Sequence, residues 1–209
     1  HDQAALFHAL KAGKPVLPVF IFDVNILEEL EVNDARVTFI HQELEQLHNT
    51  LLRKGSGFRV FHGKPLDAFK TLTGEYEVEA VFTNHDYEDY ARIRDGEVTQ
   101  FLSGLDIALY TYKDQVIFDK EEILKPNAAA YTVYSPYSRR WKSKLNEFYV
   151  TSYQVEKYAL NFLKAEMPLF PALSQLGFKK ADIQFPAREI GDVKMKEYDK
   201  KRNYPAADG

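Results

Sequence analysis

Apolar and amphipathic stretches alternate along the first half of the chain. Residues 16–22 form a nearly continuous apolar run, which is typical of a strand buried on both faces. Residues 34–54 instead repeat apolar residues with a helical period, and Asp34 is placed to cap that helix. The full prediction is helices at 2–12, 34–54, 65–76 and 87–103, and strands at 16–22, 58–63, 78–84 and 106–114.

Strands that alternate with helices of this length predict βαβ crossovers and therefore a parallel sheet. We expect an open α/β domain in which a doubly wound sheet lies between two layers of helices. Ligands of such sheets bind outside the carboxyl ends of the strands. Those ends are predicted at 23–27, 62–64, 84–88 and 113–115.

The pattern changes after Asp114. An irregular stretch leads to a helix from about Ser135, and residues 151–209 show no alternation of strands and helices. We predict an α/β domain at 1–134, followed at 135–209 by a helical extension and an interdomain linker. The first part carries 13 Lys and Arg against 22 Asp and Glu, and the second carries 14 against 9. The acidic first part argues against nucleic-acid binding by that part alone.

The composition excludes several chemistries. The 209 residues include no Cys, which excludes disulfides, thiolate metal sites and cysteine nucleophiles and favours a cytoplasmic location. The six His form no H-x-H or H-x-x-x-H pair, so no metal site is predicted, and His62 and His85 are interpreted as polar loop residues. No apolar run approaches the ~20 residues of a membrane span and no leader is present, so we expect a soluble protein. The missing G-x-G-x-x-G, G-x-x-x-x-G-K-[ST] and G-x-S-x-G patterns disfavour a conventional NAD enzyme, a P-loop nucleotide hydrolase and an α/β-hydrolase.

Charged residues near the predicted strand ends allow two interpretations each. Asp23 ends the first strand, where its carboxylate is placed either to accept a hydrogen bond from a ligand or to cap the following turn. Arg36 lies at the unfavourable positive end of a helix, which predicts an ion pair with Asp34 or another acid, or else an anionic ligand. Asp86 and Glu88 fit the ordinary stabilisation of a helix start by acids.

The predicted helix that begins at about Ser135 is basic and aromatic. Its cations are placed either to contact nucleic acid or to form a solvated or interdomain face, and the second role is the commoner one for such a helix. They are Arg139, Arg140, Lys142 and Lys144.

Six stretches occur together in the order of one known family. They are "HDQAALFHAL", "PVLPVFIFDVNIL", "DARVTFIHQELEQL", "VFTNHDYEDYARIRD", "KDQVIFDKEEIL" and "YTVYSPYSRRWKSKL". Together they cover about residues 1–145 and resemble the N-terminal antenna domain of the DNA photolyase and cryptochrome family, of the class I type that acts on cyclobutane pyrimidine dimers. The tail "YDKKRNYPAADG" is similar to the linker that leads to the family's helical domain.

The resemblance implies a Rossmann-like α/β domain that holds a light-harvesting chromophore. In relatives this antenna chromophore is a folate, a deazaflavin, FMN or FAD, and some members hold none. A folate would lie in the cleft beside the helical domain, whereas a deazaflavin or flavin would lie at the strand ends, enclosed by apolar side chains and bonded by polar ones. The positions that match this second site are Phe20, Asp23, Ile26, Leu27, Arg36, Asp86 and Glu88.

The resemblance also implies what the parent protein does. We expect a deoxyribodipyrimidine photolyase, which repairs dimers in damaged DNA by blue-light-driven electron transfer from FAD. The FAD and the DNA-binding groove would belong to a helical C-terminal domain outside these residues, so no catalytic residue is named here. We expect a monomer that contacts damaged DNA and its own FAD-binding domain, and no membrane. The alternatives are a cryptochrome-type photoreceptor and a non-photolyase module that binds a nucleotide or flavin.

One departure from the family concerns the first of its five strands. In relatives a central strand precedes the segment that begins here at His1. Without that strand, both of its neighbours would carry unpaired backbone groups, at a high cost in free energy. We therefore predict that the strand exists in the parent protein, and that a protein without it has a rearranged or unstable sheet.

Overall fold

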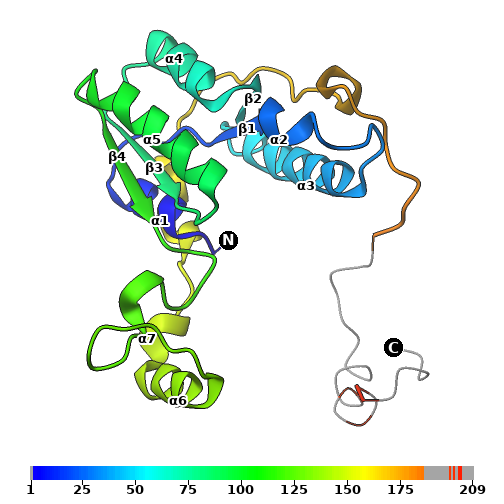
Figure 1. Ribbon diagram of the computed structural model, residues 1–209. Helices are drawn as coiled ribbons and strands as arrows, with labels where there is room; N and C mark the ends of the chain where they lie inside the picture. The colour runs from blue at the N-terminus through cyan, green and yellow to red at the C-terminus, as the bar shows by residue number, and fades with distance from the viewer. Residues whose placement is uncertain (1, 186–197, 199, 201, 204–209) are drawn as a thin grey trace.

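Four strands of five residues form two separate parallel sheets (Figure 1). In one sheet β1 (Val19–Asp23) pairs with β2 (Arg59–Gly63), and in the other β3 (Ala80–Asn84) pairs with β4 (Ala108–Tyr112). This computed structural model describes residues 2–185, 198, 200, 202 and 203. Each strand begins inside a segment that the sequence predicts as a strand.

Helices separate the strands, which confirms the predicted alternation. The side chain of Asp34 accepts a hydrogen bond from the backbone N–H of Arg36 at 2.8 Å and caps the long third helix, as its position predicts. Pro65 opens the fourth helix, where its missing N–H leaves no helical bond unmade. The helices of this region are α1 (Ala4–Lys11), α2 (Val24–Leu27), α3 (Ala35–Leu52), α4 (Pro65–Glu75) and α5 (Asp89–Ser103).

The sheet is divided. The alternation of strands and helices predicts one doubly wound sheet, whereas the family resemblance predicts a rearranged sheet for a protein without the first strand. Among the described residues, β1 and β3 are each hydrogen-bonded to a single strand. Helix α1 packs against β3 and β4, yet the strand that follows it, β1, pairs in the other sheet. The physical reason is that no described segment supplies a strand that could pair with β1 on one side and β3 on the other. The α/β class with parallel strands is confirmed, and the upstream strand stays a prediction.

Two apolar clusters hold these elements together, and both include residues from late in the chain. In the first, Phe22 of β1 is 3% exposed and packs with α3. Each large apolar side chain buried in this way contributes roughly 1.5–3 kcal/mol. The buried members are Phe22, Val37, Leu44, Leu176 and Phe178 in the first cluster, and Leu10, Val155 and Phe162 in the second.

The chain leaves the sheets after β4 and later returns to them. The predicted helix at about residue 135 is α6 (Tyr134–Lys144), which lies with α7 (Glu147–Val150) at the bottom of Figure 1. Two short 3-10 helices follow, η2 (Val155–Asn161) and η3 (Leu173–Leu176), and between them the N–H of Leu163 donates to the carbonyl of Val16 at 2.8 Å.

Part of the predicted extension therefore packs on the α/β body. The domain division at residue 134 stays a prediction. Most of the tail at 198–209, predicted as a linker, lies outside the described residues.

Candidate functional site

Three hydrogen-bonded residues meet at the carboxyl end of β1. Asp23 ends the strand and is 6% exposed, and its Oδ1 accepts from the backbone N–H of Asn25 at 3.1 Å, which caps α2. Its Oδ2 accepts from the hydroxyl of Tyr90 in α5 at 2.5 Å, and that hydroxyl accepts from Nδ2 of Asn25 at 3.0 Å. Burial, followed by the bond to Asp23, raises the pKa of the Tyr90 hydroxyl. The group connects β1 and α2 to α5.

Two roles were predicted for Asp23, and the structure shows one of them, the cap of the turn that follows the strand. The ligand-binding role stays a prediction, and it has a structural condition. Both carboxylate oxygens already accept a hydrogen bond, and the side chain is buried. Because Asp23 is buried, a ligand donor reaches it only if a side chain that covers it moves.

Arg36 pairs with Asp34, one of the two roles predicted for it. Its Nη2 lies 2.6 Å from Oδ2 of Asp34, and its side chain is 71% exposed. The hydrogen bond from this guanidinium lowers the pKa of the Asp34 carboxyl to about 2. The pair offsets the unfavourable position of a cation at a helix start.

Asp86 and Glu88 lie in the exposed loop between β3 and α5. Asp86 accepts from the backbone N–H of Tyr87 at 2.6 Å and from Nε2 of Gln115 at 3.2 Å, and these two bonds, the first more strongly, lower the pKa of its carboxyl. Glu88 precedes the first residue of α5, and its side chain makes no capping bond. Asp86 therefore joins the loops that follow β3 and β4.

The three apolar residues predicted to enclose a ring are divided between core and surface. Phe20 is half-buried, with its ring centroid 4.9 Å from that of Phe22, and Leu27 packs against the same cluster. Ile26 in α2 is 48% exposed. Ile26 is thus the member of this set that offers apolar surface to a ligand.

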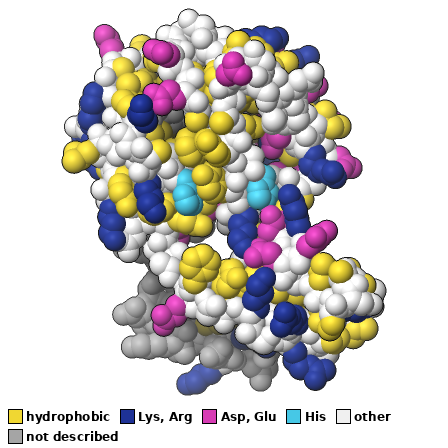
Figure 2. Space-filling view, turned by 90° about the vertical axis from the view of Figure 1, so that its left-hand side faces the viewer, with side chains coloured by type: hydrophobic (Ala, Val, Ile, Leu, Met, Phe, Trp, Pro, Cys, Tyr) yellow, Lys and Arg dark blue, Asp and Glu magenta, His cyan; other side chains and the backbone are white. Residues whose placement is uncertain are grey.

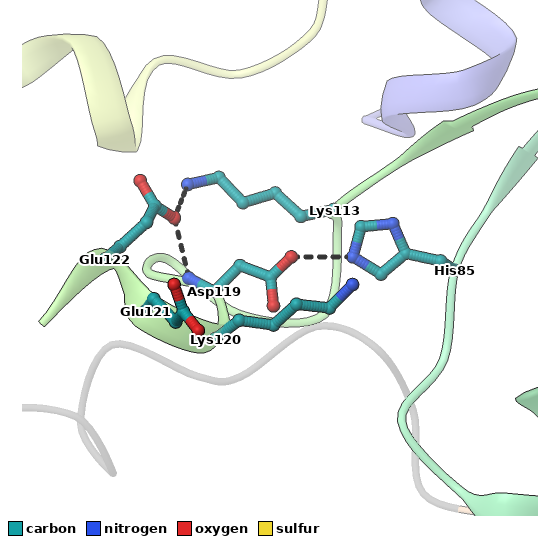
Figure 3. A pocket seen from close by; sticks show the side chains of 6 residues that line it. All are labelled: His85, Lys113, Asp119, Lys120, Glu121 and Glu122. Atoms are coloured by element: carbon teal, nitrogen blue, oxygen red, sulfur yellow. Dashed lines mark hydrogen bonds and ion pairs between the residues drawn. The ribbon is translucent and has the colours of Figure 1, made fainter. Parts of the chain in front are cut away.

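A shallow pocket of about 420 Å³ opens at the carboxyl ends of β3 and β4. As Figure 3 shows, one side chain comes from the end of each strand and the others from the loop that contains the short helix η1 (Lys120–Glu122). The pocket lies where open α/β sheets bind ligands. Its lining residues are His85, Lys113, Asp119, Lys120, Glu121 and Glu122.

The acids and bases of this pocket are largely paired with one another. Nε2 of His85 lies 2.8 Å from Oδ2 of Asp119, and Glu122 accepts from the backbone N–H of Asp119 at 2.6 Å and from Lys113. Burial, with a smaller contribution from the neighbouring Asp119, raises the pKa of Tyr87 to about 12. This pairing fixes the loop after β4 on the strand ends.

The sequence interpretation of His85 as an unpartnered polar loop residue missed its pairing with Asp119. No local pattern predicts it, because the two residues are 34 positions apart.

Lys144 joins the basic helix α6 to the loop that contains η1. Lys144 donates to the backbone carbonyl of Glu122 at 2.9 Å and lies 3.7 Å from its carboxylate. Arg139, Arg140 and Lys142 are exposed and make no ion pair within the part of the chain that the structure describes. Figure 2 shows Lys and Arg side chains over the lower part of the molecule, at the height of α6 and α7. The two predicted roles of these cations stay open.

The described residues contain neither a metal-binding cluster nor a membrane-spanning helix. No group of three or more His, Asp and Glu side chains there could hold a metal ion. No helix there combines the length and the apolar character needed to cross a membrane.

The chain is similar to known proteins in both sequence and structure. Residues 1–156 match the sequence model described as DNA photolyase. The deoxyribodipyrimidine photo-lyase of a Synechococcus species is 29% identical over 224 aligned residues, which cover 100% of this chain and 46% of that protein. The chain spans about half the length of the curated relatives it matches.

Two solved structures show the same fold. The cryptochrome of Synechocystis sp. PCC6803 superposes with a TM-score of 0.70 at 15% identity, covering 97% of this chain and 46% of that one. The archaeal photolyase from Sulfolobus tokodaii, described with two FAD molecules, superposes with a TM-score of 0.63 at 19% identity, covering 88% of this chain and 40% of that one.

Proposed function

The chain belongs to the DNA photolyase family, and from that premise we propose that it is the light-harvesting antenna part of a deoxyribodipyrimidine photolyase. The parent protein would repair cyclobutane pyrimidine dimers in damaged DNA, with FAD in a helical domain supplying the light-driven electron. This chain would hold a second chromophore and contact that FAD-binding domain. The parent protein would act in the cytoplasm as a monomer.

The observation that carries this proposal is the family match over residues 1–156. The match spans both parallel sheets and their carboxyl ends, where ligands of open α/β sheets bind. The Sulfolobus tokodaii photolyase, which shares this fold, is described as implying a novel light-harvesting cofactor. A cryptochrome shares the fold as well, so repair activity of the parent protein is what separates these two functions.

Light harvesting requires no chemical reaction by the side chains of the protein. The residues must hold a chromophore at a fixed place and orientation, and no proton transfer by a side chain is needed. The proposed holders are Asp23, Asp86 and Glu88 as hydrogen-bond acceptors, Arg36 as a cation, and Phe20, Ile26 and Leu27 as apolar contacts.

The local structure fits a planar ring that carries an N–H donor and an anionic group. Asp23 places a carboxylate at the end of β1, and the neighbouring Ile26 exposes apolar surface. Arg36 is paired with Asp34 at the surface, where solvent screens an ion pair and weakens it. An anionic group of the ligand can therefore replace Asp34 at small cost.

Chromophore retention tests the proposal. The purified protein is incubated with FMN, FAD, a deazaflavin or a reduced folate, passed through a gel-filtration column, and examined for near-ultraviolet and blue absorbance. We expect a flavin or deazaflavin to be retained, and less of it by Arg36→Ala and Asp86→Ala. The control is Asp67→Ala, which removes an exposed acid paired with Lys70 on α4.

The outcomes separate the parts of the proposal. Equal retention by all four proteins would remove Arg36 and Asp86 from the site. Retention of none of the chromophores by any of them would overturn the antenna role of this chain. Blue-light repair of a dimer-containing oligonucleotide by the parent protein would distinguish a photolyase from a cryptochrome.

A further inference from the structure

We propose that Tyr90 is a specificity-determining residue of the chromophore site, because its hydroxyl occupies the carboxylate that a ligand would bind. A ligand then reaches Asp23 by displacing Tyr90, and a ligand with a hydrogen-bond donor, such as a ring N–H, replaces the bond that is lost. The inference rests on the proposed function, and Tyr90 is not among the positions that the family resemblance implies.

Asp23 is almost wholly shielded from solvent. Its side chain is 6% exposed, Oδ1 accepts from the backbone N–H of Asn25, and Oδ2 accepts from Tyr90. Because the carboxylate is buried, a ligand atom cannot approach it while the phenol ring of Tyr90 stays in place. Each oxygen keeps a second lone pair, so burial is what bars a ligand, and a side chain that covers the carboxylate must move before a ligand donor can reach it.

Of the two donors to Asp23, Tyr90 is the one that can move away from the carboxylate. The N–H of Asn25 is part of the backbone that begins α2, so its removal would undo that turn. Tyr90 contributes only a side chain, which is 36% exposed, and its ring faces the guanidinium of Arg94 at 6.0 Å. A rotation of the side chain frees Oδ2 without breaking any backbone hydrogen bond of α5.

The shape and hydrogen bonding of the Tyr90 side chain indicate the class of ligand that could replace it. The departing group is a planar aromatic ring with a hydrogen-bond donor, so its replacement should have the same two properties. The ring imide N–H of a flavin or deazaflavin supplies the donor, and Ile26 beside the site supplies apolar contact for the ring. A planar ring without such an N–H would leave a buried carboxylate oxygen without a partner, which is unfavourable.

The substitution Tyr90→Phe tests whether the ligand displaces Tyr90 or whether Tyr90 only stabilises the fold. In Tyr90→Phe, Oδ2 of Asp23 has lost its donor before the ligand arrives, so ligand binding no longer breaks a hydrogen bond. Loss of a hydrogen bond to a charged group changes affinity by about tenfold or more. We therefore expect Tyr90→Phe to bind FMN about tenfold more tightly than the unmodified protein, although it is less stable when free.

The experiment measures FMN binding by quenching of flavin fluorescence, in the full chain and in three variants. Tyr87→Phe is the matched control, since it removes a nearby tyrosine hydroxyl that lies against Asp119 and not against Asp23. Asn25→Ala is the second test, because it removes the amide that donates to the Tyr90 hydroxyl and leaves the backbone cap intact. We expect it to raise FMN affinity several-fold, and it decides the question if Tyr90→Phe fails to fold.

The ligand side of the test uses FMN methylated at the imide nitrogen, which cannot donate. FMN should bind more tightly than the methylated compound to both the unmodified protein and Tyr90→Phe, because only its imide N–H gives Oδ2 of Asp23 a new donor, while Tyr87→Phe should leave both affinities unchanged. Equal or weaker FMN binding by Tyr90→Phe, or equal affinity of Tyr90→Phe for the two compounds, would overturn the inference. Binding by the unmodified protein without a gain in the variants rejects only the role of Tyr90. Absence of FMN binding in every variant rejects the flavin form of the proposed function as well.

Discussion

The hydroxyl of Tyr90 donates to the carboxylate of Asp23 across two sheets that share no strand pairing. Tyr90 belongs to α5, which packs on β4, while Asp23 ends β1 in the other sheet. The bond therefore joins the carboxyl ends of the two halves of the fold, and it does so through a buried charge. Several consequences for stability can be measured.

Replacement of Asp23 by Ala should lower the free energy of unfolding by about 2 kcal/mol. The variant loses the cap of α2, which is worth about 1 kcal/mol, and leaves the Tyr90 hydroxyl without its charged acceptor. Urea denaturation followed by circular dichroism measures the loss. Asp89→Ala, which removes a 97% exposed acid from the start of α5, should change stability by less than about 0.5 kcal/mol. Equal losses in the two variants would contradict the importance of the buried bond.

Replacement of Gly57 by Ala should also destabilise the protein, for a steric reason. A Cβ at this buried position would lie 2.9 Å from Cγ of Met167 and 3.1 Å from Cε1 of His48. Overpacking of this kind costs about 1–3 kcal/mol. Thermal unfolding measures the loss, with Gly74→Ala as the control. A Cβ at Gly74 meets no atom within 4 Å, and replacing a glycine inside helix α4 by alanine should raise stability by up to about 1 kcal/mol. A gain in stability from both changes would show that the contact with Met167 is not close.

Features that depend on sequence neighbours were predictable. The cap of α3 by Asp34 and the placement of Pro65 at a helix start follow from residues within one turn. The strands were predictable because their apolar runs are short and bounded by polar residues. Within the candidate site, the position of Asp23 at a strand end was predictable for the same reason.

The partners of the site residues were not predictable, because they depend on how distant segments fold together. Tyr90 is 67 positions from Asp23 and Asp119 is 34 positions from His85, so no spacing rule connects them. The local pattern of each strand does not show the division of the sheet, because that pattern is the same whether or not a further strand pairs beside it. The family resemblance, by contrast, predicts a rearranged sheet for a protein without the first strand. The sequence predicted which segments are strands, whereas pairing between them depends on the whole fold.

Protonation of His48 should destabilise the protein as the pH falls. His48 is 2% exposed, and its Nδ1 accepts from the backbone N–H of Phe58 at 3.1 Å. Burial lowers its pKa below the usual 6.5, so the unfolded chain binds the proton more readily than the folded one. The contribution to stability is therefore present above about pH 6.5 and is lost as the pH falls below that value.

Urea denaturation at a series of pH values between neutral and mildly acidic measures this dependence. His48→Asn keeps a hydrogen-bond acceptor near Nδ1 but cannot titrate, so its stability should depend less on pH in this range. His8, whose pKa is also lowered by burial, should supply part of the remaining slope. An equally steep dependence in His48→Asn would assign the effect to other groups.

One additional parallel strand between β1 and β3 should stabilise the protein, because both strands have an edge that is not paired with another described strand. Each of these strands has a single partner among the described residues, so each offers backbone donors and acceptors on its other side. Residues at the start of α1 lie beside the carboxyl end of β3, because the side chain of Asn84 accepts from the N–H of Ala5 at 3.1 Å. A chain that enters α1 from its N-terminal side therefore passes close to that edge.

We expect an apolar strand of about five residues, joined upstream of His1, to slow amide exchange in both β1 and β3 and to raise the unfolding temperature. A Gly- and Ser-rich extension of equal length is the control, since it adds chain without strand propensity. Hydrogen exchange with mass spectrometry reads the two strands separately. Protection of only one of them would show pairing at a single edge, whereas protection of both requires a strand that joins the two sheets into one. If the two extensions behaved alike, the separation of β1 from β3 would be a stable property of the fold.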